Sequence, residues 1–132
     1  MKTKKILILG GYGSVGSYIA KLLLKESTAQ VIIAGRDLKK TENFTDKCNT
    51  DYTGNRVSPK YIDVSKIETL NKSMSGVNLL LIASSTAKYT EKISKIALEF
   101  NCDYMDIHFA LYQGWDSSRF SISNYLLYKF LF

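Results

Sequence analysis

Short apolar runs alternate with segments of helical periodicity along most of the chain. The runs, which predict strands, are Ile6–Leu9, Val31–Ala34, Val57–Ile62, Val77–Ala83 and Tyr104–Ile107. Apolar residues at three- and four-residue spacing predict helices between them, over Val15–Lys25, Leu38–Cys48, Ile67–Met74 and Ile93–Phe100. Strands that are apolar throughout, rather than at alternate positions, are typical of a sheet covered on both faces. The pattern therefore predicts an α/β fold with a doubly wound parallel sheet.

Two residues that interrupt this pattern predict finer details. Pro59 lies inside the third run, and because proline lacks a backbone N–H it indicates an edge strand or an irregular start. Gly76 follows the third helical segment, where glycine is typical of a helix C-terminus. In a doubly wound sheet, ligands bind beyond the carboxyl ends of the strands where the strand order reverses. We expect that point to lie at the first and fourth strands.

A glycine-rich turn joins the first predicted strand to the first predicted helix. Gly11, Gly13 and Gly16 form the pattern G-x-G-x-x-G directly after the apolar run. In a dinucleotide-binding unit the first glycine permits the tight turn, the second lets the backbone approach a pyrophosphate, and the third lets the helix pack closely. Free N–H groups at the helix start face the anion. We expect dinucleotide binding here, against the alternative of a purely structural turn, through Gly11, Tyr12, Gly13, Ser14, Val15 and Gly16.

The residues after the second strand predict which dinucleotide is bound. A site for NAD typically has Asp or Glu here, which accepts a hydrogen bond from the ribose 2′-hydroxyl and repels a 2′-phosphate. This chain has Gly35 and Arg36, and a guanidinium matches the geometry of a phosphate. Asp37 keeps NAD open as the alternative, and its other interpretation is the N-cap of the second helix. We expect NADP as the preferred cofactor, with Lys39 or Lys40 adding positive charge.

Two further features follow the fourth and fifth strands. Ser84 and Ser85 lie where the chain would pass under the nicotinamide ribose, and their alternative role is to start the fourth helix. His108 is the only residue suited by type to proton transfer near neutral pH, although a lone histidine is more often structural. No second group is placed to pair with it, so the catalytic residues stay unassigned. A nicotinamide cofactor carries hydride chemistry itself, so an oxidoreductase remains open.

Length and composition exclude several classes of protein. At 132 residues the chain predicts a single domain with its own core. The net charge of +6 is scattered rather than gathered in a basic run, so we expect no nucleic-acid partner. Cys48 and Cys102 form no C-x-x-C pair and have no ligand cluster nearby, which predicts reduced thiols and no metal site. The apolar runs are too short for a signal peptide or a membrane span, and we expect a cytoplasmic protein without a membrane partner.

The sequence pattern changes after Ala110. We expect residues 1–110 to form the dinucleotide-binding domain and residues 111–132 to form a C-terminal tail. The tail is rich in serine and then in aromatic and aliphatic residues. A short helix, a sixth strand at the sheet edge and exposed apolar sequence are all compatible with this segment.

Several stretches between Lys5 and Asp106 resemble the N-terminal cofactor domain of the saccharopine dehydrogenase family. They follow the family's order and lie at residues 6–16, 31–37, 63–64, 76–81 and 104–107. The resemblance implies a Rossmann fold and an NAD(P)-dependent oxidoreductase that interconverts an imine and a secondary amine of an amino-acid adduct. It also suggests that Asp63 or the backbone of Val64 contacts the adenine, whereas the alternative for Asp63 is a helix cap.

The sequence departs from the family in three respects. Ser84-Ser85-Thr86 replaces a Gly-Pro-Phe turn after the fourth strand, and Asp106 is followed by Ile-His-Phe-Ala where members often have Gly-Glu. The family continues into a large substrate domain, which this sequence lacks. We therefore expect a cofactor domain that is incomplete as a catalyst alone and associates with itself or with a substrate-domain partner. The alternative is a non-catalytic redox sensor or interaction module that binds a dinucleotide.

Overall fold

The computed structural model describes residues 3–107, which form a five-stranded sheet of order β3-β2-β1-β4-β5. The strands are β1 (Lys5–Leu9), β2 (Gln30–Gly35), β3 (Val57–Tyr61), β4 (Leu79–Ile82) and β5 (Asp103–Asp106). The helices are α1 (Ser14–Glu26), α2 (Leu38–Asp51), α3 (Ile67–Asn71) and α4 (Thr90–Glu99), with a 3-10 turn η1 (Ala87–Tyr89) before α4. Every strand pairing in this sheet is parallel, which confirms the predicted doubly wound fold.

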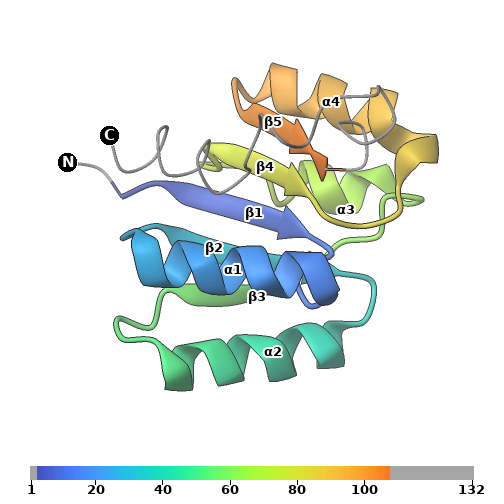
Figure 1. Cartoon of the computed structure of the whole chain (residues 1–132). Coiled ribbons are helices and arrows are strands. Elements are labelled where there is room, and N and C mark those ends of the chain that lie inside the picture. The colour runs from blue at the N-terminus through green and yellow to red at the C-terminus, as the bar shows by residue number, and fades with distance from the viewer. Residues whose placement is uncertain (1–2, 108–132) are drawn as a thin grey trace, which may run out of the picture.

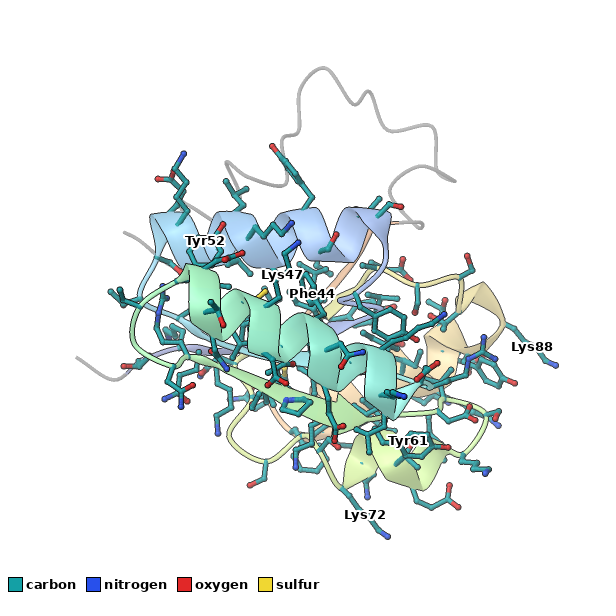
Figure 2. The ribbon with its side chains drawn as sticks, turned by 90° about the horizontal axis from the view of Figure 1, so that it is seen from below. Phe44, Lys47, Tyr52, Tyr61, Lys72 and Lys88 are labelled. Carbon is teal, nitrogen blue, oxygen red and sulfur yellow. The ribbon has the colours of Figure 1, made fainter. Side chains whose placement is uncertain are left out.

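Helices cover both faces of the sheet (Figure 1). On one face, Leu23 of α1 belongs to a buried cluster against which Phe44 of α2 and Tyr52, directly after α2, pack. Figure 2 shows Phe44 and Tyr52 on the side of α2 that faces α1. On the other face, Leu70 of α3 and Ile93 of α4 share a second cluster. The two cores explain why the strands are apolar at consecutive positions.

The central strand β1 contributes to both cores. Ile6 and Ile8 belong to the cluster under α1 and α2, whereas Leu7 and Leu9 belong to the cluster under α3 and α4. Successive side chains of a strand point to opposite faces, so this division follows from the strand geometry. All four side chains are at most 3% exposed. Burying each of them contributes roughly 1.5–3 kcal/mol, which fixes the strand that leads into the glycine turn.

An arginine from the loop before β3 holds the C-terminal end of α1. The guanidinium of Arg56 donates hydrogen bonds to the carbonyl oxygens of Ser27 (2.8 Å) and Ala29 (3.0 Å), and also to that of Leu24. The last carbonyl groups of a helix have no donor within the helix, so they need partners from elsewhere. Arg56 therefore ties the end of α1 to the beginning of β2.

Two details predicted from the sequence are wrong. Gly76 does not end α3, which stops at Asn71; it has a φ of +76° and lies in the turn before β4. Backbone N–H groups after α3 bond to carbonyls three residues back, so the helix gives way to turns before Gly76. Phe100 follows α4 and is 38% exposed, so it is not part of the buried face of that helix.

The strand β3 lies at an edge of the sheet, as Pro59 predicts. The N–H of Ile62 donates to the carbonyl of Gly35 at 3.1 Å. The backbone N–H and carbonyl groups of even-numbered residues along β3 therefore point toward β2, and those of odd-numbered residues point away from the sheet. Pro59 is an outward position and has no N–H to offer. Val57 is another, and its N–H and carbonyl both bond to the side-chain amide of Asn49, at 3.1 and 2.9 Å.

In the part of the chain that the structure describes, no helix has the length and apolar character needed to cross a membrane. His108, the predicted boundary after Ala110 and the predicted tail at 111–132 lie outside the described residues.

Candidate functional site

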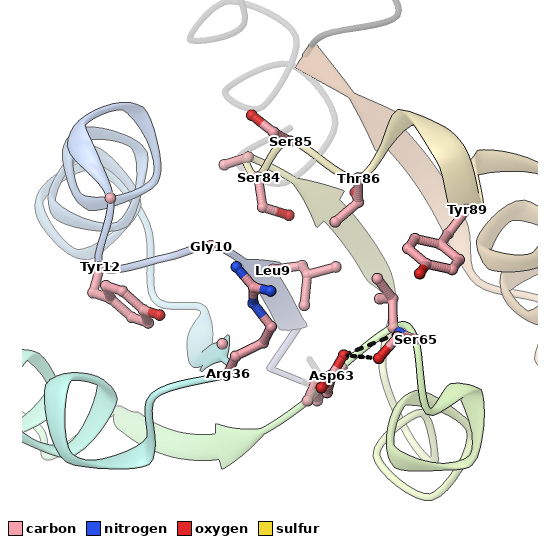
Figure 3. A pocket seen from close by; sticks show the side chains of 15 residues that line it. Leu9, Gly10, Tyr12, Arg36, Asp63, Ser65, Ser84, Ser85, Thr86 and Tyr89 are labelled. Carbon is pink, nitrogen blue, oxygen red and sulfur yellow. Dashed lines mark hydrogen bonds between the residues drawn. The ribbon is translucent and has the colours of Figure 1, made fainter.

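A cavity of about 440 Å³ opens at the carboxyl ends of β1, β2, β3 and β4 (Figure 3). This is the predicted place, because β1 and β4 are adjacent and the helices that follow them cover opposite faces. Four segments line it: Leu9 at the end of β1, with Gly10, Tyr12 and Gly13 after it; Gly35 at the end of β2, with Arg36 after it; Ile62, Asp63, Val64 and Ser65 after β3; and Ala83, Ser84, Ser85, Thr86 and Tyr89 after β4.

The tight turn after β1 depends on Gly10. Its φ of +82° lies in the left-handed region that favours glycine, and a Cβ there would lie 2.8 Å from the Cβ of Ser84. Its carbonyl accepts a hydrogen bond from the N–H of Gly13 at 3.1 Å. Gly11 has no positive φ, and a Cβ there would meet the side chain of Ile33 at 3.0 Å. The prediction that Gly11 permits the turn is therefore wrong: Gly10 makes the turn, and Gly11 lets it lie against β2.

Gly16 brings α1 against this turn. A Cβ on Gly16 would lie 2.2 Å from the carbonyl oxygen of Gly10, so the close helix packing predicted for this glycine is confirmed. Gly13 is the N-cap, and its carbonyl accepts a hydrogen bond from the N–H of Ser17 at 2.8 Å. The N–H groups between Gly13 and Ser17 belong to the first turn of α1. Because glycine has no side chain that could cap them, they remain available to an anion. A Cβ at Gly13 would meet the Gly10 carbonyl at 3.3 Å and is otherwise unobstructed.

Arg36 brings a positive charge to the rim of the cavity. Its side chain is exposed, and in Figure 3 the guanidinium lies between Tyr12 and Asp63. Asp37 does not line the cavity; its carboxylate accepts a hydrogen bond from the N–H of Lys40 at 3.1 Å. This bond caps α2 and confirms the N-cap interpretation of Asp37. Arg36 is left as the side chain after β2 that reaches the cavity.

Asp63 carries a negative charge on the opposite side of Arg36 from Tyr12. Its Oδ1 accepts hydrogen bonds from the hydroxyl and the N–H of Ser65, at 2.6 and 3.0 Å. The bond from the Ser65 hydroxyl, more than the charges of Lys66 and Arg36, holds the pKa of Asp63 below its usual range. The N-cap of α3 is Lys66, so the interpretation of Asp63 as a helix cap is wrong. Asp63 instead closes a local turn and keeps an ionised carboxylate at the cavity.

Two hydroxyl groups in the cavity wall lack partners. Ser84 Oγ and Thr86 Oγ1 are buried and make no hydrogen bond within residues 3–107. The helix α4 begins only at Thr90, after η1, so Ser84 and Ser85 do not start the fourth helix. Buried polar atoms are nearly always hydrogen-bonded. Both residues line the cavity, so a polar ligand there would lie near two hydroxyls that have no other partner.

Not every predicted site residue lines the cavity. Gly11 and Gly16 act by packing, Asp37 caps a helix, and Ser14 and Val15 are exposed in the first turn of α1. The lining residues outside the predicted set of cofactor-binding residues are Leu9, Gly10, Gly35, Ile62, Ser65, Ala83, Thr86 and Tyr89. Most of them are next to a predicted residue in the sequence, so extending each predicted segment by one residue would have included them. Tyr89 carries no such signal, because it reaches the cavity only through the η1 turn.

A half-buried tyrosine and a carboxylate meet at the end of β5, outside the cavity lining. The hydroxyl of Tyr104 donates a hydrogen bond to Oδ2 of Asp106 at 3.1 Å. Burial, and then the charge of Asp106, raise the pKa of Tyr104, so the phenol stays protonated. Among residues 3–107 no cluster of His, Cys, Asp and Glu side chains could hold a metal ion.

A family model, the saccharopine dehydrogenase NADP binding domain, matches residues 6–131. The chain belongs to this family. Its cofactor is accordingly NADP, the dinucleotide predicted from Arg36. No curated protein matches the sequence.

Solved structures share the fold of this NADP-binding domain. Apo saccharopine dehydrogenase (L-Glu forming) from Saccharomyces cerevisiae matches 94% of the chain with 18% identity and a TM-score of 0.64, over 24% of its own length. Triphenylmethane reductase of Citrobacter sp. in complex with NADP(H) matches 76% with 24% identity and a TM-score of 0.56, over 35% of its length. The RhlG/NADP active-site complex of Pseudomonas aeruginosa matches 74% with 20% identity and a TM-score of 0.54, over 42% of its length. The domain thus spans less than half the length of each.

The cavity of this NADP-binding domain fits its cofactor in three respects. The open first turn of α1 suits a pyrophosphate, since its N–H groups have no capping side chain. Arg36 suits a 2′-phosphate, to which a guanidinium can donate two parallel hydrogen bonds. The unpartnered hydroxyls of Ser84 and Thr86 suit a ribose or an amide, which both donate and accept hydrogen bonds.

Proposed function

We propose that the chain is the cofactor-binding part of an oxidoreductase that transfers a hydride at a C–N bond of an amino-acid adduct. Bound NADP(H) supplies or accepts the hydride, whereas the protein binds and orients the cofactor. Membership of the saccharopine dehydrogenase family supports this reaction class. The carbon–nitrogen substrate is the part of the proposal that needs its own test.

Each segment of the cavity wall has a role in this proposal. The N–H groups of Ser14, Val15 and Gly16 hold the pyrophosphate at the start of α1. Arg36 binds the 2′-phosphate through charge-assisted hydrogen bonds. Asp63 or the backbone of Val64 contacts the adenine. Ser84 and its neighbours Ser85 and Thr86 hold the nicotinamide ribose, which gives the buried hydroxyls their missing partners.

One observation carries the proposal: Arg36 and Gly13, the N-cap of α1, line one cavity, and the strand β2 between them ends in glycine rather than in an acidic residue. An acidic residue there would favour the ribose 2′-hydroxyl of NAD and repel a 2′-phosphate. The side chain that reaches the cavity after β2 is instead cationic, which favours the phosphorylated dinucleotide.

Fluorescence titrations of the full chain with NADPH and NADH test this assignment. The wild type should bind NADPH more tightly than NADH. Arg36→Ala should remove about 1.5–3 kcal/mol from the binding of NADPH, about 10- to 150-fold in Kd, because it deletes charge-assisted bonds to the 2′-phosphate. NADH binding should change little. Lys47→Ala is the matched control, since it removes the same charge from an exposed position of α2 outside the cavity.

The reaction class has a separate test. The full chain is mixed with NADPH, a 2-oxo acid and an amino acid, and the absorbance of NADPH is followed. We expect cofactor binding without turnover, because the cavity roles assigned above all concern the cofactor and the substrate contacts come from outside residues 3–107. Turnover that appears only when a substrate-domain protein is added would support the proposal. If NADPH were consumed at the same rate with and without the oxo acid, the proposed carbon–nitrogen reaction would be contradicted.

A further inference from the structure

The ring of Tyr12 occupies the space that a side chain on Gly35, the last residue of β2, would fill. A Cβ built on Gly35 would lie 2.3 Å from Cε1 of Tyr12 and 3.0 Å from both Cζ and the phenol oxygen. No real Cβ tolerates the first of these distances. Both residues line the cavity, and Figure 3 shows the Tyr12 ring extending from the glycine turn into that space.

The backbone at Gly35 does not itself require glycine. Its φ lies outside the left-handed region, in contrast to Gly10, Gly54 and Gly76. The three atoms nearest to a Cβ at this position all belong to Tyr12. A side chain at position 35 would therefore have to displace the phenol ring. The ring is not free to swing aside at no cost, because it packs against the buried cluster under α1 and α2.

We propose that Tyr12 is a specificity-determining residue, because its ring occupies the space that a ribose-binding carboxylate at the end of β2 would use. The proposal rests on the cofactor assignment made above and deepens it. Gly35 ends β2, the position from which an acidic side chain would reach the ribose 2′-hydroxyl of NAD. With that space filled by an uncharged ring, the cavity keeps Arg36 as its charged side chain after β2. The exclusion of the carboxylate comes from Tyr12, and the attraction of the 2′-phosphate comes from Arg36.

The test compares NADPH and NADH titrations of the full chain as wild type and as three variants: Gly35→Asp, Tyr12→Phe/Gly35→Asp and Tyr12→Ala/Gly35→Asp. With the ring present, the new carboxylate displaces it into the cavity, so the first two variants should bind both dinucleotides weakly. With the ring removed, the carboxylate can reach the ribose. The third variant should bind NADH at least about tenfold more tightly than the first two, and its preference should turn toward NADH. Tyr12→Phe is the matched control because it keeps the ring and loses only the hydroxyl.

Urea unfolding of Gly35→Ala in the wild-type and Tyr12→Ala backgrounds tests the steric premise without a cofactor. The substitution should lower the unfolding midpoint when the ring is present and lower it much less when the ring is absent. Equal midpoint changes in the two backgrounds would overturn the inference, as would equal NADH binding by the Tyr12→Phe and Tyr12→Ala double variants. If the wild type binds NADPH and either result is found, only the role of Tyr12 fails. If the wild type binds neither dinucleotide, the proposed function fails and the inference with it.

Discussion

Replacing Gly16 with alanine should disrupt the junction between β1 and α1. The new methyl group would lie 2.2 Å from the carbonyl oxygen of Gly10 and 2.8 Å from the Cα of Gly11. An ordinary contact needs at least about 3.4 Å, and both opposing atoms are backbone, so no side chain can rotate to make room. Either α1 moves outward by roughly an ångström or the turn deforms.

The magnitude follows from two opposing effects. Overpacking a tight junction costs about 1–3 kcal/mol, and a clash against backbone belongs at the upper end. Alanine in a helix regains about 1 kcal/mol over glycine, because glycine has more backbone freedom to lose on folding. We therefore expect Gly16→Ala to lower the free energy of unfolding by about 2 kcal/mol. With an m-value of about 2 kcal/mol per molar urea, this is a fall of about 1 M in the unfolding midpoint.

Gly13→Ala is the matched comparison, because it adds the same methyl group three residues earlier. There the methyl group meets the Gly10 carbonyl at 3.3 Å and otherwise points into open space, from a backbone with φ of −73° that alanine adopts readily. We expect its free energy of unfolding to stay within about 1 kcal/mol of wild type. Its Kd for NADPH should rise at least about tenfold, since the methyl group keeps a pyrophosphate from the turn. A Gly16→Ala protein that unfolds at the wild-type midpoint would refute the packing argument.

Three further changes test other parts of the fold. Arg56→Leu removes the donors that tie α1 to β2. The free energy of unfolding in urea should fall by about 2–3 kcal/mol, with NADPH binding unchanged; an unchanged free energy of unfolding would mean that the Arg56 hydrogen bonds do not stabilise the fold. Asp37→Ala removes the N-cap of α2 and should cost about 1 kcal/mol. It should leave the preference between NADPH and NADH unaltered, and a changed preference would make Asp37 a ribose ligand. Burial raises the pKa of Cys102 to about 11, so the folded state holds the thiol proton more tightly than the unfolded chain. Its stabilising contribution is full below the unfolded pKa of about 8.5 and is lost as the pH rises toward the folded value, so wild type should lose more stability than Cys102→Ala across that range; parallel urea midpoints would contradict this.

The fold could be predicted because its signals are local and redundant. The runs that begin at Ile6 and Val31 are apolar at consecutive positions, as two covered sheet faces require. Each forms a strand, which begins one residue earlier in both cases and ends one residue later in the second. Prediction failed where short polar turns decide the geometry. The backbone hydrogen bonds that end α3 at Asn71 do not affect the spacing of apolar residues. The spacing therefore predicts a helix that runs on to Gly76, several residues too far.

The candidate site was predictable to the extent that sequence spacing defines it. The glycine pattern predicts the turn but not which glycine has positive φ, because Gly10 and Gly11 are adjacent and differ only in backbone conformation and in contacts with distant residues. The partnership of Tyr12 with Gly35 joins segments far apart in the chain, so no local pattern could reveal it. For the same reason, the unpartnered state of Ser84 Oγ became visible only once the surrounding backbone was in place.

The outer side of β3 bears on how copies of this protein behave at high concentration. A foreign strand that extends the sheet there would need to pair with the outward backbone groups of Val57, Pro59 and Tyr61. The proline offers no donor, and the amide of Asn49 already occupies both groups of Val57. That side is therefore a poor template for strand addition. Pro59 and Asn49 oppose fibre-like growth of the sheet there, a task for which other proteins use a charged residue on the edge strand.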